Sequence, residues 1–237
     1  MKRSFTTVAV VAGPIALVSA AALVLLSGCG SHTASNRQES TATSSTEGSG
    51  VLTTQKRNVA DFTRLDLAGT SKVIVRVGAP KSVVIHADNN LLPLITMKVT
   101  DGTLEVSQKG DFISHRGIQV DVAIPSLAGV TLSGTGDLVV TGVRTDRFKV
   151  DLTGAGRLEV SGTAKRVDAS LAGVGAARLG RLLSSDMHVV VSGTGSATVV
   201  ATKSLDASVS GTGSVTYHGN PQHIKTSVTG TGSVLPG

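Results

Sequence analysis

The sequence is poor in aromatic residues: its 237 residues include no tryptophan, one tyrosine and four phenylalanines. It also has a single cysteine, which excludes an internal disulfide bond and any cysteine-rich zinc or iron–sulfur site. Apolar residues nevertheless make up 40% of the chain, enough for a folded domain. Because valine, leucine, isoleucine and alanine must supply nearly all of the core, we expect a narrow, closely stacked interior.

The N-terminus has the features of a bacterial lipoprotein signal. Two basic residues precede an apolar segment over residues 8–26, and small residues with a cysteine follow it. The predicted lipobox and lipidation site are Leu26, Ser27, Gly28 and Cys29. Cleavage before Cys29 would anchor the chain in the membrane through acyl chains on that residue and would lower the net charge from +6 to +4. An uncleaved transmembrane helix is the alternative, since the segment is just long enough to span a bilayer.

The segment after the lipobox is too polar to form a core. From Cys29 to Gly50 it is rich in serine, threonine, alanine and glycine and has no large apolar residue. We therefore expect residues 1–28 to be a signal peptide, residues 29–50 a flexible tether, and residues 51–237 a single domain outside the cytoplasm.

A repeat of about 19 residues organises the second half of the chain. Each copy has an apolar residue, a small residue and Gly-x-Gly, and the first glycines of six copies follow at intervals of 20, 19, 20, 18 and 19 residues. The repeat glycines are Gly134, Gly136, Gly154, Gly156, Gly173, Gly175, Gly193, Gly195, Gly211, Gly213, Gly230 and Gly232. Alternating apolar residues on both sides predict two short strands per copy, hinged where glycine permits a positive φ or close backbone approach. Stacked copies predict an all-β, parallel β-solenoid.

The repeat also predicts which residues of neighbouring coils lie side by side. The residues five positions before the first glycines are Gly129, Lys149, Asp168, His188, Asp206 and Lys225. We expect them to form an outward-facing column of alternating charge, with His188 between two aspartates. The same register places Asp137 beside Arg157 and Glu159 beside Arg178.

Residues 51–125 are less regular. Strand-like alternation occurs over residues 73–77, 83–86, 97–99, 104–106 and 118–124. We expect these segments to begin the same solenoid as an irregular capping region, because the terminal repeats of a stack must shield its end. A separate β-sandwich over residues 51–125 is the alternative.

Several short motifs within residues 58–237 carry a family resemblance. They are Phe62 with Leu65-Asp66-Leu67 and Gly69, Asp101-Gly102-Thr103-Leu104, Ile124-Pro125-Ser126-Leu127, the repeated Ser-Gly-Thr-Gly, and Val215-Thr216-Tyr217-His218-Gly219-Asn220-Pro221. The chain resembles the bacterial putative auto-transporter adhesin family, also called the head GIN domain. This resemblance implies an exported, right-handed β-solenoid without agreed catalytic residues.

No motif for a cofactor, a metal or catalysis stands out. The Gly-x-Gly pairs lack the third glycine and the helix of a dinucleotide site, and the period does not fit calcium-binding nonapeptides. A carbohydrate-active enzyme or a glycan-binding protein on the same scaffold remains the alternative function. For the enzyme, the best carboxylates are Asp137 beside Arg157, or Asp151 and Asp168 near Lys149. We interpret these groups as salt pairs, and we expect neither a cofactor nor a metal.

Six basic residues fall in the predicted connections between coils. They are Arg144, Arg147, Lys165, Arg166, Arg181 and Lys203. In a stack they would form either a basic stripe for anionic envelope polymers or lipid headgroups, or simply solvated turns. Nucleic acid is not expected, because an exported chain with so few aromatic residues lacks stacking platforms. The sequence therefore predicts a non-enzymatic, lipid-anchored envelope protein for adhesion or contact with another envelope component, with a signalling or stress partner as a further alternative.

Overall fold

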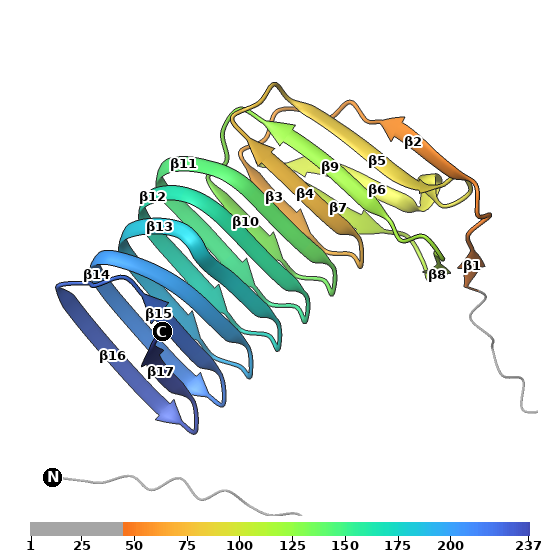
Figure 1. The fold of residues 1–237 in the computed structure, drawn as a ribbon. Helices are drawn as coiled ribbons and strands as arrows, with labels where there is room; N and C mark the ends of the chain where they lie inside the picture. Colours follow the sequence, from red (N-terminus) through yellow and green to blue (C-terminus); the bar gives the residue numbers. More distant parts are fainter. Residues whose placement is uncertain (1–44) are drawn as a thin grey trace, which may run out of the picture. The chain divides into compact units, whose positions relative to one another are not determined.

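The computed structural model describes residues 45–237, which lie in one compact unit made almost entirely of β-strands (Figure 1). The only helix among these residues is the 3-10 helix η1 (Leu92–Leu94). No helix in this part of the chain is long and apolar enough to cross a membrane. The predicted signal peptide, lipobox and Cys29, with the tether up to residue 44, lie outside the described residues.

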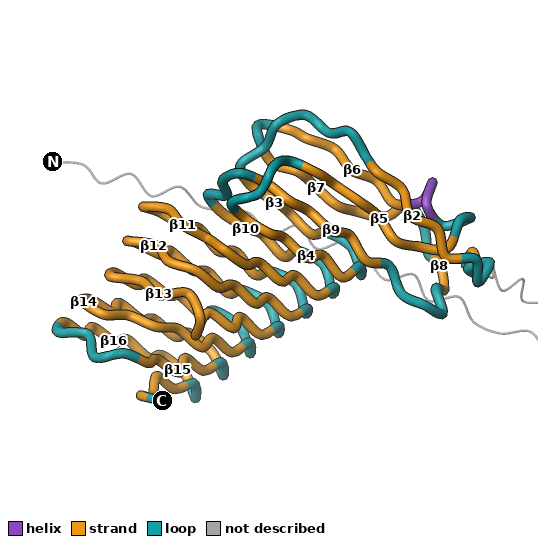
Figure 2. The backbone as a smooth tube through the Cα atoms, turned by 45° about the horizontal axis from the view of Figure 1, so that its top comes forward, coloured by secondary structure: helices purple, strands orange, loops and turns teal. Residues whose placement is uncertain are grey.

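Long strands stacked in parallel form the body of the predicted solenoid. They are β11 (Asp137–Leu152), β12 (Arg157–Leu171), β13 (Ala176–Val191) and β14 (Ser196–Gly211), followed by β15 (Ser214–His218), β16 (His223–Gly230) and β17 (Ser233–Pro236). Each long strand contains both halves of a repeat and bends between them, so one bent strand replaces the two short strands expected. Figure 2 shows loops at the Gly-x-Gly corner, while β11 to β14 continue through the opposite bend.

Successive Gly-x-Gly turns lie directly on one another. A Cβ atom on Gly154 would overlap the carbonyl oxygen of Gly134, and one on Gly173 would overlap that of Gly154. Among the twelve repeat glycines only Gly211 (φ 142°) and Gly230 (φ 110°) have a positive φ. Close stacking, rather than backbone conformation, is therefore what requires glycine at most of these turns.

The predicted register is confirmed along the stack. His188 pairs with Asp168 on one side and with Asp206 on the other, and the column continues to Lys149 and Lys225 as expected. The Nδ1 atom of His188 lies 3.6 Å from the carboxylate of Asp206.

All strands of residues 51–132 except the two-residue strand β8 (Phe112–Ile113) belong to the same sheet as the repeats, so the expectation of a capping region is confirmed and a separate sandwich does not form. They are β2 (Leu52–Lys56), β3 (Arg64–Leu67), β4 (Lys72–Val77), β5 (Ser82–Asp88), β6 (Ile95–Thr100), β7 (Thr103–Gln108), β9 (Gln119–Ile124) and β10 (Gly129–Leu132). Three antiparallel contacts, β2 with β5, β5 with β9 and β6 with β7, form the cap. All remaining contacts in this sheet are parallel.

The stacking order does not follow the chain order. The coil of β3 and β4 lies between the coil of β7 and β9 and the coil of β10 and β11. Its turn acts as a further copy of the repeat, because the turn glycines Gly134 and Gly136 stack on the carbonyls of Gly69 and Ser71. The sequence reasoning missed this copy because a serine replaces its second glycine.

The end of the predicted tether is attached to the cap. The two-residue strand β1 (Thr46–Glu47) pairs with β8 (Phe112–Ile113). The side-chain amide of Asn90 donates to the carbonyl oxygen of Glu47 at 2.7 Å, and its oxygen accepts from the backbone N–H of Ser49 at 2.9 Å. Residues 46–49 thus take part in the fold.

The core is narrow and aliphatic, as the shortage of aromatic residues predicted. Leu67, Leu132, Leu152 and Leu171 are buried one above another on successive strands. Phe148 is the largest fully buried side chain among the described residues.

Candidate binding groove

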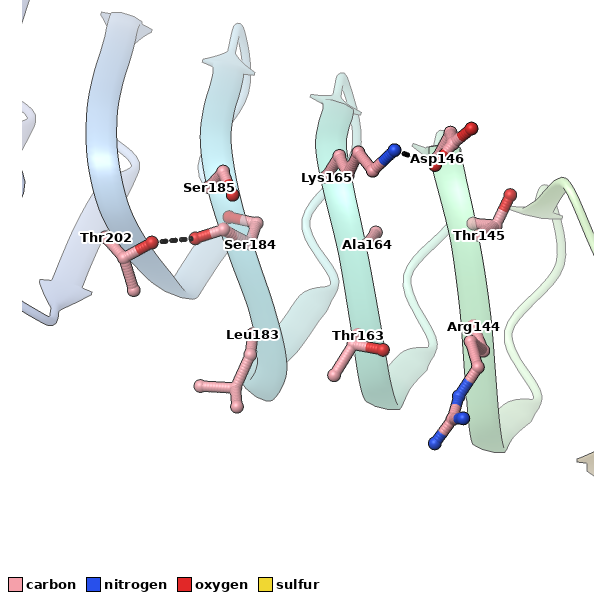
Figure 3. A pocket seen from close by; sticks show the side chains of 10 residues that line it. All are labelled: Arg144, Thr145, Asp146, Thr163, Ala164, Lys165, Leu183, Ser184, Ser185 and Thr202. Carbon is pink, nitrogen blue, oxygen red and sulfur yellow. Dashed lines mark hydrogen bonds and ion pairs between the residues drawn. The ribbon is translucent and has the colours of Figure 1, made fainter.

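A hollow of about 610 Å³ crosses β11 to β14 at their bends. Its side chains form rows across the strands (Figure 3). Arg144, Thr163 and Leu183 form one row, and Thr145, Ala164 and Ser184 form the next. Asp146, Lys165, Ser185 and Thr202 complete the lining.

A bulge in β13 shapes this groove. The interval from Arg178 to Ser184 in β13 is six positions, whereas the paired interval in β14, from Thr198 to Ala201, is three. The pairing of β13 with β14 is thus interrupted beside the groove. Leu183 is 54% exposed, and its register neighbours Thr163 and Arg144 are exposed as well. Irregularities of this kind are over-represented near functional sites because they redirect side chains.

Hydrogen bonds to the backbone hold the floor of the groove. The buried hydroxyl of Ser184 donates to the carbonyl oxygen of Val200 at 2.6 Å, and the hydroxyl of Thr202 donates to the carbonyl oxygen of Ser184 at 3.1 Å. Within residues 45–237 the hydroxyls of Thr163 and Ser185 have no such partner. These two hydroxyls are therefore available to a ligand.

Three of the six predicted basic residues are neutralised by carboxylates. Lys165 pairs with Asp146 at 2.8 Å, and this hydrogen bond and charge raise the pKa of Lys165. Arg166 lies 3.2 Å from Asp168, and Arg181 lies 3.7 Å from Glu159. Glu159 also has Arg178 as its register partner, as expected, but its ion pair is with Arg181.

The other three, Arg144, Arg147 and Lys203, form no ion pair within the described part of the chain. Arg144 lies in the groove, Arg147 is three positions further along β11, and Lys203 follows Thr202. All six lie inside strands rather than in turns. Of the six, only Arg144 and Lys165 line the groove, while Arg147 and Arg166 are register partners on neighbouring strands. The basic residues therefore do not form one row along the stack.

The carboxylates considered for catalysis form ion pairs. Asp137 lies 3.8 Å from Arg157, Asp151 lies 2.7 Å from Lys149, and Asp168 pairs with Arg166. This confirms their interpretation as salt pairs. Among residues 45–237, no three His, Cys, Asp or Glu side chains are grouped so as to hold a metal ion.

The sequence reasoning missed a chain of polar contacts across the cap. The Nδ1 atom of His86 lies 3.1 Å from the hydroxyl of Thr54, and its Nε2 atom lies 3.0 Å from the carboxylate of Asp121. Gln119 donates to the same carboxylate at 3.1 Å. These residues come from β2, β5 and β9, which are distant in sequence and share no motif, so only the antiparallel pairing brings them together. The imidazole links the edge strand β2 to the sheet.

Comparison with known proteins places most of the chain in one family. The family model described as putative auto-transporter adhesin, head GIN domain, matches residues 61–221. No curated protein matches the sequence.

Several solved structures share this fold. A putative adhesin from Bacteroides fragilis is 24% identical, with a TM-score of 0.66 over 80% of this chain and 99% of that one. A putative adhesin from Parabacteroides merdae is 21% identical, with a TM-score of 0.56 over 81% and 98%. One from Parabacteroides distasonis is 23% identical, with a TM-score of 0.52 over 82% and 100%. At these identities the similarity concerns the fold.

Proposed function

The chain belongs to the putative auto-transporter adhesin, head GIN domain family, and on this basis we propose that it is a non-enzymatic, lipid-anchored envelope protein that binds an anionic polymer of the cell envelope. The observation that carries the proposal is the groove across β11 to β14, with the unpaired cation Arg144 in its lining and the unpaired Arg147 and Lys203 close to lining residues in the sequence. The family description and the names of the structural neighbours support an adhesive role.

An anionic chain suits this groove. The guanidinium of Arg144 can donate two parallel hydrogen bonds to a carboxylate or phosphate. The hydroxyls of Thr163 and Ser185 can bind sugar hydroxyls, and Leu183 offers an exposed apolar contact beside them. Because neighbouring strands lie about 4.8 Å apart, a polymer running across them would meet these groups in succession.

A binding assay tests this function. The soluble chain from residue 30 onward would be mixed with cell-wall fractions, alone and with the double change Arg144→Glu and Arg147→Glu. We expect affinity to fall about tenfold or more, because a hydrogen bond to a charged group contributes about 1.5–3 kcal/mol.

A charge reversal elsewhere provides the matched control. Lys109 and Arg116 are exposed beside the cap, far in sequence from the groove strands, so the double change Lys109→Glu and Arg116→Glu should leave binding unchanged. Equal losses in both proteins would reject the groove as the site. No binding by the unmodified chain would reject the polymer as the ligand.

Lipid anchoring rests on the sequence pattern that ends at Cys29. Its test is to grow cells with a fatty-acid analogue and analyse the labelled protein by mass spectrometry. The label should appear on an N-terminal peptide that begins at Cys29. A protein without this label would reject the anchor while leaving the polymer binding to be judged by its own assay.

A further inference from the structure

The two ends of the stack differ in how their edges are covered. At the cap, the antiparallel strands β2 and β6 lie outermost, and Leu91, Leu92 and Ile95 are buried around η1. At the other end, β16 pairs with β14 on one side and with no other strand of the described residues. All eight residues of β16 are exposed.

The core columns continue into β16 without being covered there. Ile224 is 49% exposed and Val228 is 45% exposed. Their register partners in β14, Leu205 and Val209, are 1% and 2% exposed. One more strand beside β16 would therefore bury the inward-facing apolar side chains as the preceding coils do.

The edge of β16 has few of the usual features that prevent pairing. It contains no proline, and its register with β14 runs without a bulge from His223 to Gly230. Lys225 is its single charged residue and lies in the outward-facing column. Natural edge strands are commonly protected by charged side chains, especially lysine, and by proline, bulges or inward-pointing charges; of these features β16 has only Lys225.

We propose that two copies of this chain associate through β16, with the two strands antiparallel. The pairing is centred on Thr226, which means that Thr226 of one copy lies directly opposite Thr226 of the other. Side chains alternate between the two faces of a strand, so two residues that lie opposite each other point to the same face. The inward-facing apolar residues of both copies therefore stay on the inside only if the numbers of each opposed pair of residues add up to an even number. Centring on Thr226 places Ile224 of each copy opposite Val228 of the other. It also places Lys225 opposite Ser227, so no like charges face each other.

The neighbouring registers are poorer. Centring on Lys225 would place two lysines directly opposite each other, which is destabilising. Centring on Ser227 would place Ile224 opposite Gly230 and lose its apolar contact. The pattern of β16 therefore selects one self-complementary pairing with a two-fold axis through Thr226. This association does not depend on polymer binding.

Mass measurement tests the dimer. Residues 45–237 have their own core, so the soluble chain from residue 30 onward is suitable for light scattering after size exclusion. We expect twice the monomer mass, and the monomer mass for Thr226→Lys, which sets two lysines face to face at the axis. In the monomer this lysine reaches solvent, so the circular dichroism spectrum should be unchanged.

His223→Lys is the matched control, because it adds the same charge to the same strand but faces Thr229 of the other copy. It should remain dimeric. A monomeric unmodified chain at its highest soluble concentration would overturn the proposal. Pairing of β16 only with a strand from another protein would also overturn it.

Cysteine substitution tests the register. The chain from residue 30 onward has no cysteine, so each variant carries a single thiol. With copper–phenanthroline and oxygen as the oxidant, Thr226→Cys should give a disulfide-linked dimer, because directly opposed Cα atoms lie about 4.5–5.5 Å apart. Val228→Cys should not form this disulfide. In the proposed register Val228 lies opposite Ile224, so the two Val228 positions are four residues apart along the strands, about 13 Å. The reverse result would overturn the pairing centred on Thr226.

Discussion

The carbonyl oxygen of Gly134 occupies the space that a side chain on Gly154 would need. The same turns are also hydrogen-bonded, since the backbone N–H of Gly154 donates to the carbonyl oxygen of Leu132 at 3.1 Å. Neither turn can move away without breaking the backbone hydrogen bonds between successive coils. The repeat glycines are therefore fixed by the distance between coils.

Gly154→Ala should lower the free energy of unfolding by about 1–3 kcal/mol or more, because the added methyl group overpacks backbone atoms that cannot move away. Gly180→Ala is the control: its nearest heavy atom would be Cγ2 of Thr198 at 3.4 Å, an ordinary contact. This change should be neutral or stabilising by about 0.4–1 kcal/mol. Urea unfolding measures both, and equal effects would contradict the stacking explanation.

Asp66→Asn should stabilise the protein at neutral pH. Burial raises the pKa of Asp66 above its ordinary value of 3.8, although the hydroxyl of Ser133 donates to it at 2.9 Å, and Glu105 and Asp151 raise that pKa further. The folded state therefore holds this proton more tightly than the unfolded state, so stability falls as pH rises through the folded pKa.

The gain from Asp66→Asn should shrink as pH falls below 3.8, where the carboxyl is protonated in both states. Unfolding free energies of the two proteins between acidic and neutral pH provide the measurement. A difference that stays constant with pH would assign the effect to packing instead of charge.

His188→Glu should destabilise the outward column by about 0.2–1 kcal/mol for each like-charge pair, because it would place three acidic residues on neighbouring strands. His188→Lys keeps a long side chain and places a positive charge between Asp168 and Asp206, so it should not destabilise. Thermal unfolding of both variants at low and high salt provides the measurement. Salt should reduce the stability loss of His188→Glu, because it screens the repulsion between the acidic side chains. Similar losses for both variants would show that charge does not decide this position.

A chain that ends at residue 125 should not fold. Leu65 and Leu67 of β3 are fully buried partly because β10 lies beside them, and β4 likewise needs β11. Extending the fragment to residue 171 restores β10, β11 and β12 and should restore a cooperative unfolding transition. Circular dichroism and denaturant unfolding compare the two, and an independently folded short fragment would support the sandwich alternative.

Periodicity explains what the sequence could and could not predict. The outward column around His188 follows from a nearly constant repeat length, because equal spacing assigns one partner to each residue. The position of β3 does not follow, because its alternating pattern would fit against any neighbouring strand. The sequence shows that the first glycines lie 20 residues apart before Gly193 and 18 residues apart after it. These unequal intervals do not predict where along β13 the irregular pairing near Leu183 occurs.

The basic residues show a second limit. Arg144 and Lys165 lie among polar residues that read as a turn, yet a bend in a continuous strand also satisfies this pattern. Glycines at this corner could have indicated the bend, since Gly142 (φ 80°) and Gly162 (φ 138°) both have positive φ there. Cross-strand contacts such as Thr54 with His86 depend on antiparallel pairing, which local patterns do not specify.

The inner position of the β3 and β4 coil has a consequence for how the molecule is assembled. These strands are made early in synthesis but end with neighbours on both sides, so the stack must grow from them in two directions. β5 to β9 complete one side first, and the chain then crosses back between Ile124 and Gly129 to start the other. Until β10 and β11 have been synthesised, one side of this inner coil has no partner, so a wrong strand can pair with it as well as the right one.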